Sequence, residues 1–138
     1  PTGPFGLIHR KTDFVQPWYD VHQDAAVYPA FHVMAGLSEL SGAPRIGVEA
    51  KGDKGIAVLA SVKDGGIVLW LANLTADTRI VRIGGATSSA MATVLSAEAF
   101  EAMTEDPVFM TSAGTPLRDG RLDLGAYAVA RVSIPGNE

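Results

Sequence analysis

The polar residues that could do chemistry in this chain are concentrated in one short run, Asp20-Val21-His22-Gln23-Asp24. In an extended segment the side chains at positions 20, 22 and 24 point the same way. Two carboxylates flanking an imidazole could bind a divalent metal, or one carboxylate could orient His22 for acid–base work. A simpler interpretation is favoured because short Asp/His spacings are common: Asp24 caps a helix, His22 is a loop residue and Asp20 is solvated. We therefore assign no metal and no cofactor.

Aromatic and basic side chains surround that run. They are Phe14, Trp18, Tyr19 and Tyr28, together with His9, Arg10 and Lys11. Aromatic rings beside polar groups suit a sugar, whose C–H faces stack on them. Packing of the loop onto the next helix explains the same pattern, and it is favoured because aromatic residues in loops most often serve packing. The substrate-binding candidates that we retain are Trp18, Tyr19, Asp20 and His22, and no catalytic residue is assigned.

Other motifs are interpreted structurally. Asn73-Leu74-Thr75 matches a glycosylation sequon, but an asparagine at a strand end is more often a turn residue. His32 falls in the middle of the expected helix, beside Phe31, and is assigned as a structural histidine. The sequence contains no Gly-x-Ser-x-Gly or His-Glu-x-x-His motif, and its glycine pairs match no phosphate-binding fingerprint.

The elements that would position these residues begin with a strand, a loop and a helix. We expect a strand at residues 6–10 and a loop at residues 11–24, which have no hydrophobic period. A helix is predicted over residues 25–40, with Asp24 as its N-cap and Gly42 just past its end. Its apolar face is expected to consist of Val27, Phe31, Met34, Leu37 and Leu40.

After this helix the sequence changes to short β-type segments separated by turn residues. The predicted strands are residues 46–50, 55–62, 67–73, 79–83, 90–95, 121–124 and 127–134. Short strands at this spacing indicate a mainly β chain that folds as an antiparallel β-sandwich. One or two helical turns are expected at residues 96–105, with Ser96 as their N-cap, and a loop at residues 106–118.

The longest apolar run, residues 67–75, is predicted to contain the central strand. Alternate side chains of an extended chain fall on opposite faces, so Val68 and Trp70 share one face and Leu69 and Leu71 the other. Because both faces are apolar, both should be covered by other elements. The glycines that precede the run predict a hairpin with the strand before it.

Composition excludes several classes of function. The chain has 138 residues, of which 47% are hydrophobic and 19% charged, so one folded domain is expected. The net charge of −4 and the lack of a basic stripe argue against nucleic-acid binding. The chain has no cysteine, which fits a reducing compartment such as the cytoplasm, and no apolar run of bilayer length. Its first residue is Pro1 rather than Met, which suggests a processed or excised piece.

Four segments carry a family resemblance. They are the run from Val27 to Val33 with Leu37, Leu40 and Gly42-Ala43-Pro44; the run Leu69-Trp70-Leu71-Ala72-Asn73-Leu74-Thr75; Leu95 to Phe100; and Leu124 to Arg131. Together they resemble the last barrel helix and the C-terminal β-sandwich of D-apionate lactonase-like proteins, relatives of the clan-A glycoside hydrolases. The resemblance covers most of the chain.

The resemblance implies a division of the chain. Residues 1–43 would correspond to the end of a (β/α)₈ barrel, with residues 11–24 as a loop on its catalytic face, and residues 44–138 to the sandwich. The catalytic carboxylates of such hydrolases lie at barrel strands four and seven, upstream of Pro1. The chain would then be a non-catalytic domain that packs on and supports an upstream barrel, in a parent that hydrolyses a sugar lactone or a glycosidic bond.

Two alternatives remain open. One is a free-standing carbohydrate-binding sandwich, and the other is a small metal-dependent enzyme that uses Asp20, His22 and Asp24. If the barrel is missing, the apolar surface of the helix at residues 25–40 has no partner and should pair with a second copy of the chain.

Overall fold

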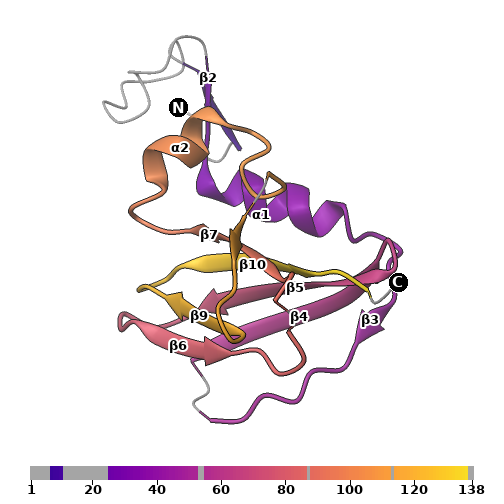
Figure 1. Ribbon diagram of the computed structural model, residues 1–138. Helices are drawn as coiled ribbons and strands as arrows, with labels where there is room; N and C mark the ends of the chain where they lie inside the picture. Colours follow the sequence, from indigo (N-terminus) through magenta and orange to yellow (C-terminus); the bar gives the residue numbers. More distant parts are fainter. Residues whose placement is uncertain (1–6, 11–24, 53–54, 87, 113, 137–138) are drawn as a thin grey trace.

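The computed structural model describes residues 7–10, 25–52, 55–86, 88–112 and 114–136. These residues form a mainly β structure in which a large antiparallel sheet is covered by helices on one face and by a small sheet on the other (Figure 1). The prediction of an antiparallel sandwich is confirmed. None of the described helices is long and apolar enough to cross a membrane.

The large sheet has six strands in the order β3-β4-β5-β10-β7-β8. They are β3 (Arg45–Ile46), β4 (Ile56–Lys63), β5 (Gly66–Asn73), β7 (Met91–Leu95), β8 (Thr115–Pro116) and β10 (Val129–Ile134). The predicted hairpin is confirmed, since β4 and β5 pair antiparallel, but its turn is one residue earlier than the two glycines: Asp64 and Gly65 have φ angles of 51° and 76°, and Gly66 is the first residue of β5. Two successive positive φ angles give a turn whose twist matches that of the strands.

The small sheet consists of β6 (Arg79–Arg82) and β9 (Arg121–Leu124), which pair antiparallel. Its inward side chains, Leu122 and Leu124, are buried against the large sheet in a cluster that includes Leu69 and Leu71 of β5. This cluster is the core between the two sheets, and it accounts for one apolar face of β5.

Two helices cover the other face of β5. They are α1 (Pro29–Ser38) and α2 (Phe100–Glu105). Val68 and Trp70 are buried there in a second cluster with Met103 and Met110. The expectation that both faces of β5 are covered is therefore confirmed, but Trp70 faces the helices and does not lie between the two sheets.

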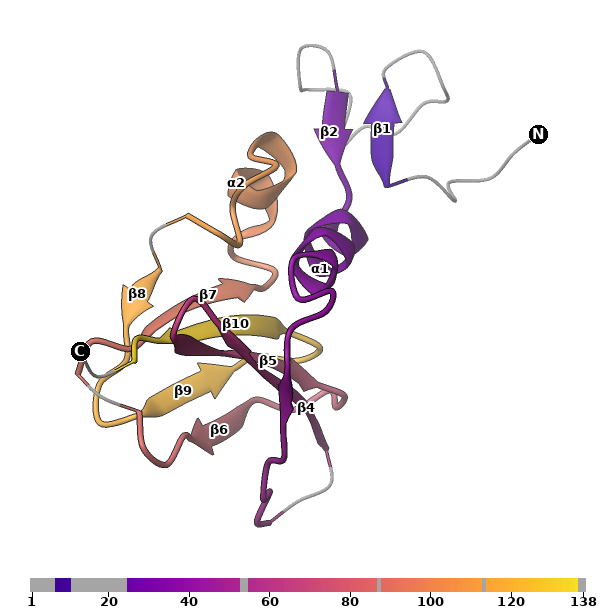
Figure 2. The ribbon, with the colours of Figure 1, turned by 90° about the vertical axis from the view of Figure 1, so that its right-hand side faces the viewer.

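The start of the predicted helix is wrong. Residues 25–27 form a strand, β2 (Ala25–Val27), which pairs antiparallel with β1 (Ile8–Arg10). The helix begins only at Pro29, after Tyr28 at the N-cap, whose side chain makes no capping hydrogen bond. The run Ala-Ala-Val is compatible with a helix locally, but pairing with β1 outweighs that propensity. Figure 2 shows α1 between the β1–β2 ribbon and the large sheet.

The predicted apolar face of the helix is also wrong in part. Met34 and Leu37 are 57% and 38% exposed, whereas His32, Gly36 and Leu40 are buried. The buried residues follow an i, i+4, i+8 spacing, so the helix does have one buried face. The pattern of hydrophobic residues missed it because a histidine and a glycine contribute to that face.

Smaller differences concern the ends of elements. Only β3 forms from the strand predicted at residues 46–50, and β8 lies in the expected loop. Ser96 does not cap α2: its carbonyl accepts a hydrogen bond from the N–H of Ala99 in a turn that precedes the helix. Its hydroxyl instead donates to the Glu98 carboxylate, which lowers the pKa of Glu98.

Candidate functional site

The candidate residues taken from the sequence lie outside the described residues. This applies to Trp18, Tyr19, Asp20 and His22, and also to Asp24, so no geometry bears on them. Among the described ranges, no group of three histidine, aspartate or glutamate side chains could hold a metal ion. Of the aromatic and basic set, His9, Arg10 and Tyr28 are among the described residues.

His9 and Tyr28, one on each side of residues 11–24 in the sequence, contact each other directly. His9 of β1 is buried, and its Nδ1 lies 3.1 Å from the hydroxyl of Tyr28. The two rings meet edge to face at a centroid distance of 6.1 Å, and the Tyr28 N–H donates to the Leu7 carbonyl. The histidine is therefore held in one orientation by the residue at the start of α1. The pair ties the β1–β2 ribbon to the helix.

A glycine sets the distance between α1 and the large sheet. A Cβ atom at position 36 would overlap the indole ring of Trp70. The helix can approach β5 this closely because Gly36 carries no side chain, and the indole fills the space under it. Trp70 is 5% exposed. A ring packed against a helix at a glycine makes a close contact between two elements far apart in sequence.

A buried histidine links α1 to α2. His32 is 1% exposed, and its Nε2 lies 2.6 Å from the carbonyl oxygen of Met103 in α2. A carbonyl only accepts, so Nε2 carries the proton and donates it. The ring also meets Phe31 and Phe109 edge to face. This agrees with its assignment as a structural histidine.

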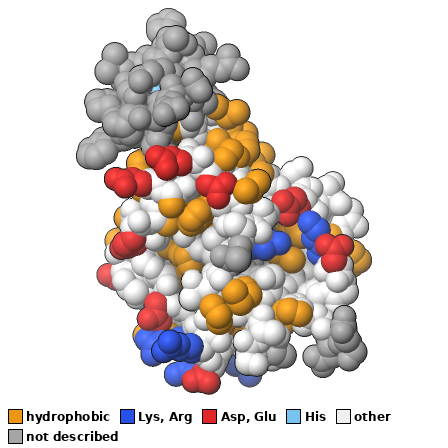
Figure 3. All heavy atoms as spheres, turned by 45° about the horizontal axis from the view of Figure 1, so that its top comes forward, with side chains coloured by type: hydrophobic (Ala, Val, Ile, Leu, Met, Phe, Trp, Pro, Cys, Tyr) orange, Lys and Arg blue, Asp and Glu red, His pale blue; other side chains and the backbone are white. Residues whose placement is uncertain are grey.

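The opposite side of α1 carries an exposed apolar face, which we define as Ala30, Met34 and Leu37 together with Tyr127. Tyr127 is 68% exposed and has a φ of 55°, which a tyrosine rarely adopts. A shallow cleft of about 300 Å³, lined by Pro29, Ala30 and Tyr127 among others, connects it to the helix. Figure 3 shows that hydrophobic side chains are exposed among polar ones on the face of the molecule that it draws.

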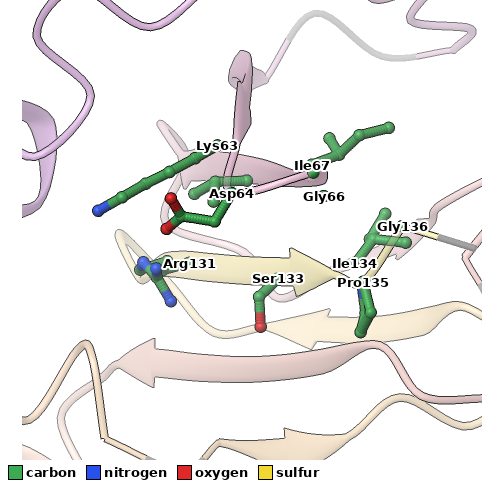
Figure 4. Close-up of a pocket in the computed structure, with 11 residues that line it drawn as sticks. Lys63, Asp64, Gly66, Ile67, Arg131, Ser133, Ile134, Pro135 and Gly136 are labelled. Carbon is green, nitrogen blue, oxygen red and sulfur yellow. The ribbon is translucent and has the colours of Figure 1, made fainter. Parts of the chain in front are cut away.

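A shallow groove lies at the end of the β4–β5 hairpin (Figure 4). It has a volume of about 490 Å³. Lys63, Asp64 and Arg131 gather at one end, and Ile134 and Pro135 lie at the other. Lys63 forms an ion pair with Glu39 at 3.3 Å, and the negative charge of the Asp64 carboxylate offsets the positive charge of Arg131. The groove therefore offers little net charge to a ligand.

The asparagine of the sequon is committed to the fold. Asn73 is 2% exposed, and its side-chain amide donates to the carbonyls of Asp77, Leu124 and Gly125 at 2.8, 3.2 and 2.7 Å. Its Oδ1 accepts from both the N–H and the hydroxyl of Thr75. The amide nitrogen is thus not accessible to a glycosyl donor, and the turn interpretation is correct. The sequence signal was the polar residue that ends an apolar run.

Comparisons with known proteins agree with the architecture. A family model described as "D-apionate lactonase, C-terminal immunoglobulin-like domain" matches residues 53–132. The search of curated proteins found no match. Among solved structures, a GH30 endoxylanase from Clostridium papyrosolvens C71 is 16% identical, with a TM-score of 0.56, over 80% of this chain and 28% of that one.

A second solved structure is a glycoside hydrolase family 30 subfamily 8 xylanase, Xyn30A, from Clostridium acetobutylicum. It is 17% identical, with a TM-score of 0.43, over 65% of this chain and 23% of that one. At such identities the likeness to the endoxylanase concerns the fold alone. The chain spans less than a third of the length of either xylanase.

Proposed function

Because this chain belongs to the family of D-apionate lactonase C-terminal immunoglobulin-like domains, we propose that it is a non-catalytic accessory domain of a carbohydrate-active hydrolase. Its role is to pack on the barrel of the parent protein and support it. The parent would hydrolyse a sugar lactone or a glycosidic bond, and the cytoplasm is the proposed compartment because the chain has no cysteine. We keep the division into residues 1–43 and 44–138 as part of this proposal.

The observation that carries the proposal is the way in which α1 packs on the rest of the chain. One face of the helix is fixed to the large sheet by Gly36 against Trp70 and to α2 by His32. The other face exposes Met34 and Leu37, and Tyr127 is exposed beside the first turn of the helix, where it lines a cleft with Ala30. A helix that is rigid on one side and apolar on the other is suited to hold a second body in a fixed position.

The proposed partner of the exposed apolar face is the upstream barrel. The β1–β2 ribbon enters α1 directly, so the helix would be continuous with the barrel elements that precede it. In the isolated chain the same face would be free to pair with a second copy, which is the proposed basis of a homodimer. A carbohydrate would contact this domain only through Trp18, Tyr19, Asp20 and His22, on the loop proposed to face the barrel's cleft.

The test compares this chain with its parent protein. The isolated chain should show no turnover of sugar lactones or aryl glycosides, whereas the parent hydrolyses one of these classes. In the parent, Met34→Asp with Leu37→Asp should lower the melting temperature of the barrel by several degrees, since a loss of about 1–2 kcal/mol shifts a melting temperature by about 2–8 °C. The control is Ser38→Asp, a neighbouring exposed residue of α1.

Two outcomes would overturn the proposal. Turnover by the isolated chain would show that catalytic residues lie within it. Equal melting temperatures for the Met34/Leu37 variant and the Ser38 control would show that the helix face does not support the barrel.

A further inference from the structure

The two sheets of the sandwich differ in width, and this leaves part of the large sheet uncovered. Ile56, Val58 and Ala60 of β4 point toward the core between the sheets. Ala60 is buried, but Ile56 and Val58 are only half-buried, although they lie on the inner face. The small sheet has two strands against six, so among the described residues no strand covers this end of β4.

The uncovered area is a groove of about 720 Å³. Its floor is formed by β4 and β5, and its walls by β6 on one side and the segment at residues 46–51 on the other. The side chains that line the floor are Ile56, Val58, Ala60, Leu69 and Leu71. A groove with an apolar floor between a strand edge and a neighbouring segment is the shape left when a sandwich lacks one strand of its smaller sheet.

The wall at β6 is an open strand edge. The Ile83 N–H donates to the Gly120 carbonyl at 2.8 Å, so residue 83 pairs with the β9 side. Successive residues of an antiparallel strand alternate in direction, and Val81 and Arg79 therefore also pair with β9. The N–H and C=O groups of Ile80 and Arg82 point the other way. Within the described residues no strand lies on that side to pair with them.

The charge of this edge limits what can pair with it. β6 reads Arg-Ile-Val-Arg and has no acid. Arg79 is engaged by Thr75 and Asp77, whereas Arg82 is exposed and has no hydrogen bond or ion pair with any other described residue. Residues opposite each other in an antiparallel pair share one hydrogen-bonding direction, so pairing of β6 with a second copy of itself centred on Arg82 would place the two Arg82 side chains opposite each other. Like charges in that position are destabilising, so a partner strand with an acid is favoured.

We propose that β6 and the groove beside it receive one extended segment of the parent protein, from outside this chain. That segment pairs with the free N–H and C=O groups of Ile80 and Arg82, inserts alternate apolar side chains over Ile56 and Val58, and carries an acidic side chain next to Arg82. The inference rests on the proposed function, because the parent supplies the segment. It adds a second attachment, on the side of the sandwich away from α1.

Hydrogen–deuterium exchange tests this inference on the isolated chain and on the intact parent protein. The amides of Ile80 and Arg82 should exchange at least about tenfold more slowly in the parent, because they become strand-paired there. The amides of Arg79 and Val81 serve as internal references, since their pairing with β9 exists in both. Equal rates at Ile80 and Arg82 in chain and parent would overturn the inference.

A pair of substitutions in the parent separates the effect of backbone pairing at the β6 edge from the effect of the Ile80 side chain. Ile80→Pro removes only an N–H that faces away from β9, which edge strands tolerate, and Ile80→Val keeps it. Ile80→Pro should abolish the slow exchange at Arg82, and Ile80→Val should retain it. Thermal melts of the isolated chain with each substitution show whether the sandwich itself still folds; a Pro variant that folds and keeps the slow exchange would contradict strand pairing.

The outcomes distinguish this inference from the proposed function. Slower exchange of the α1 amides in the parent, with exchange at β6 unchanged, would support docking of the barrel on α1. It would overturn the pairing of an added strand with β6. No change at either place would overturn the proposed function itself. Slow exchange at Ile80 in the isolated chain that depends on protein concentration would assign the edge to a second copy and overturn the choice of the parent.

Discussion

The two faces of the large sheet are covered in different ways. On the helix face, Trp70 is enclosed by α1 through Gly36, and His32 bonds to Met103 across the layer. On the strand face, Leu124 and Val132 are fully buried at the centre of the core, but Val58 near its edge is half-buried beside an open groove. The described helices cover Trp70 on one face of the sheet, whereas the other face is covered only over the area that β6 and β9 reach.

This difference indicates which face of the large sheet is covered by the chain's own described elements. A close fit between a ring and a helix backbone leaves no room for another occupant, so the helix face holds α1 in place. The two-stranded small sheet is too narrow to cover all six strands, so part of the apolar strand face stays uncovered by the described elements. Substitutions on the two faces should therefore have unequal effects.

The largest effect is expected for Trp70→Ala. Removal of a buried indole leaves a cavity under α1 and should cost about 3–5 kcal/mol of unfolding free energy. Val58→Ala on the strand face should cost less, about 1 kcal/mol, because that side chain is already half-buried. Urea unfolding of both variants measures the two losses, and similar values would remove the distinction between the faces.

The second effect concerns the distance between α1 and β5. Gly36→Ala should destabilise the chain by about 1–3 kcal/mol, although alanine is the better helix former, because its Cβ would overlap Trp70. Gly47→Ala is the control, since nothing lies within 4 Å of a Cβ at that position. Thermal melts of the two variants give the comparison. A stabilised Gly36→Ala variant would mean that α1 sits further from the sheet.

The third effect lies on the strand face, where Asn73 joins β5 to the turn between β9 and β10. Asn73→Asp retains the oxygen that accepts from Thr75 but loses the donors to the carbonyls of Leu124 and Gly125. We expect a loss of about 1–3 kcal/mol, measured by chemical unfolding, because buried acceptors are left without partners. Asn73→Ala should cost at least as much. If Asn73→Asp is neutral, the amide donors do not hold the turn.

The smallest effect is a pH dependence of the small sheet. Arg121 hydrogen-bonds Asp123, which lowers the pKa of that carboxyl below its ordinary value. A lowered folded-state pKa contributes stability above the unfolded value, and this is lost as the pH falls through the folded value, below about pH 4. Because both side chains of the pair are exposed to solvent, the loss should be small and should disappear at high salt. Melting temperatures of wild type and Asp123→Asn at pH 3 and pH 7 measure it.

The sequence by itself determined the class of fold and most of its strands. The continuous apolar run at residues 67–73 identified a strand with two apolar faces, and the glycines before it identified the hairpin, because both signals are local. The limits of β9 were predicted from its flanking turn residues. The segments shared with the lactonase family were also visible in the sequence, and the family model confirms them for residues 53–132.

Only the tertiary structure decided which side of α1 is buried and where the chain is left open. A hydrophobic pattern cannot recognise His32 and Gly36 as buried residues, since one depends on the Met103 carbonyl and the other on the indole of Trp70. Residues 25–27 are a strand because β1 lies beside them, which no local propensity encodes. The open edge of β6 likewise appears only when the widths of the two sheets are compared, because an unpaired edge is a property of neighbours in space and not of neighbours in sequence.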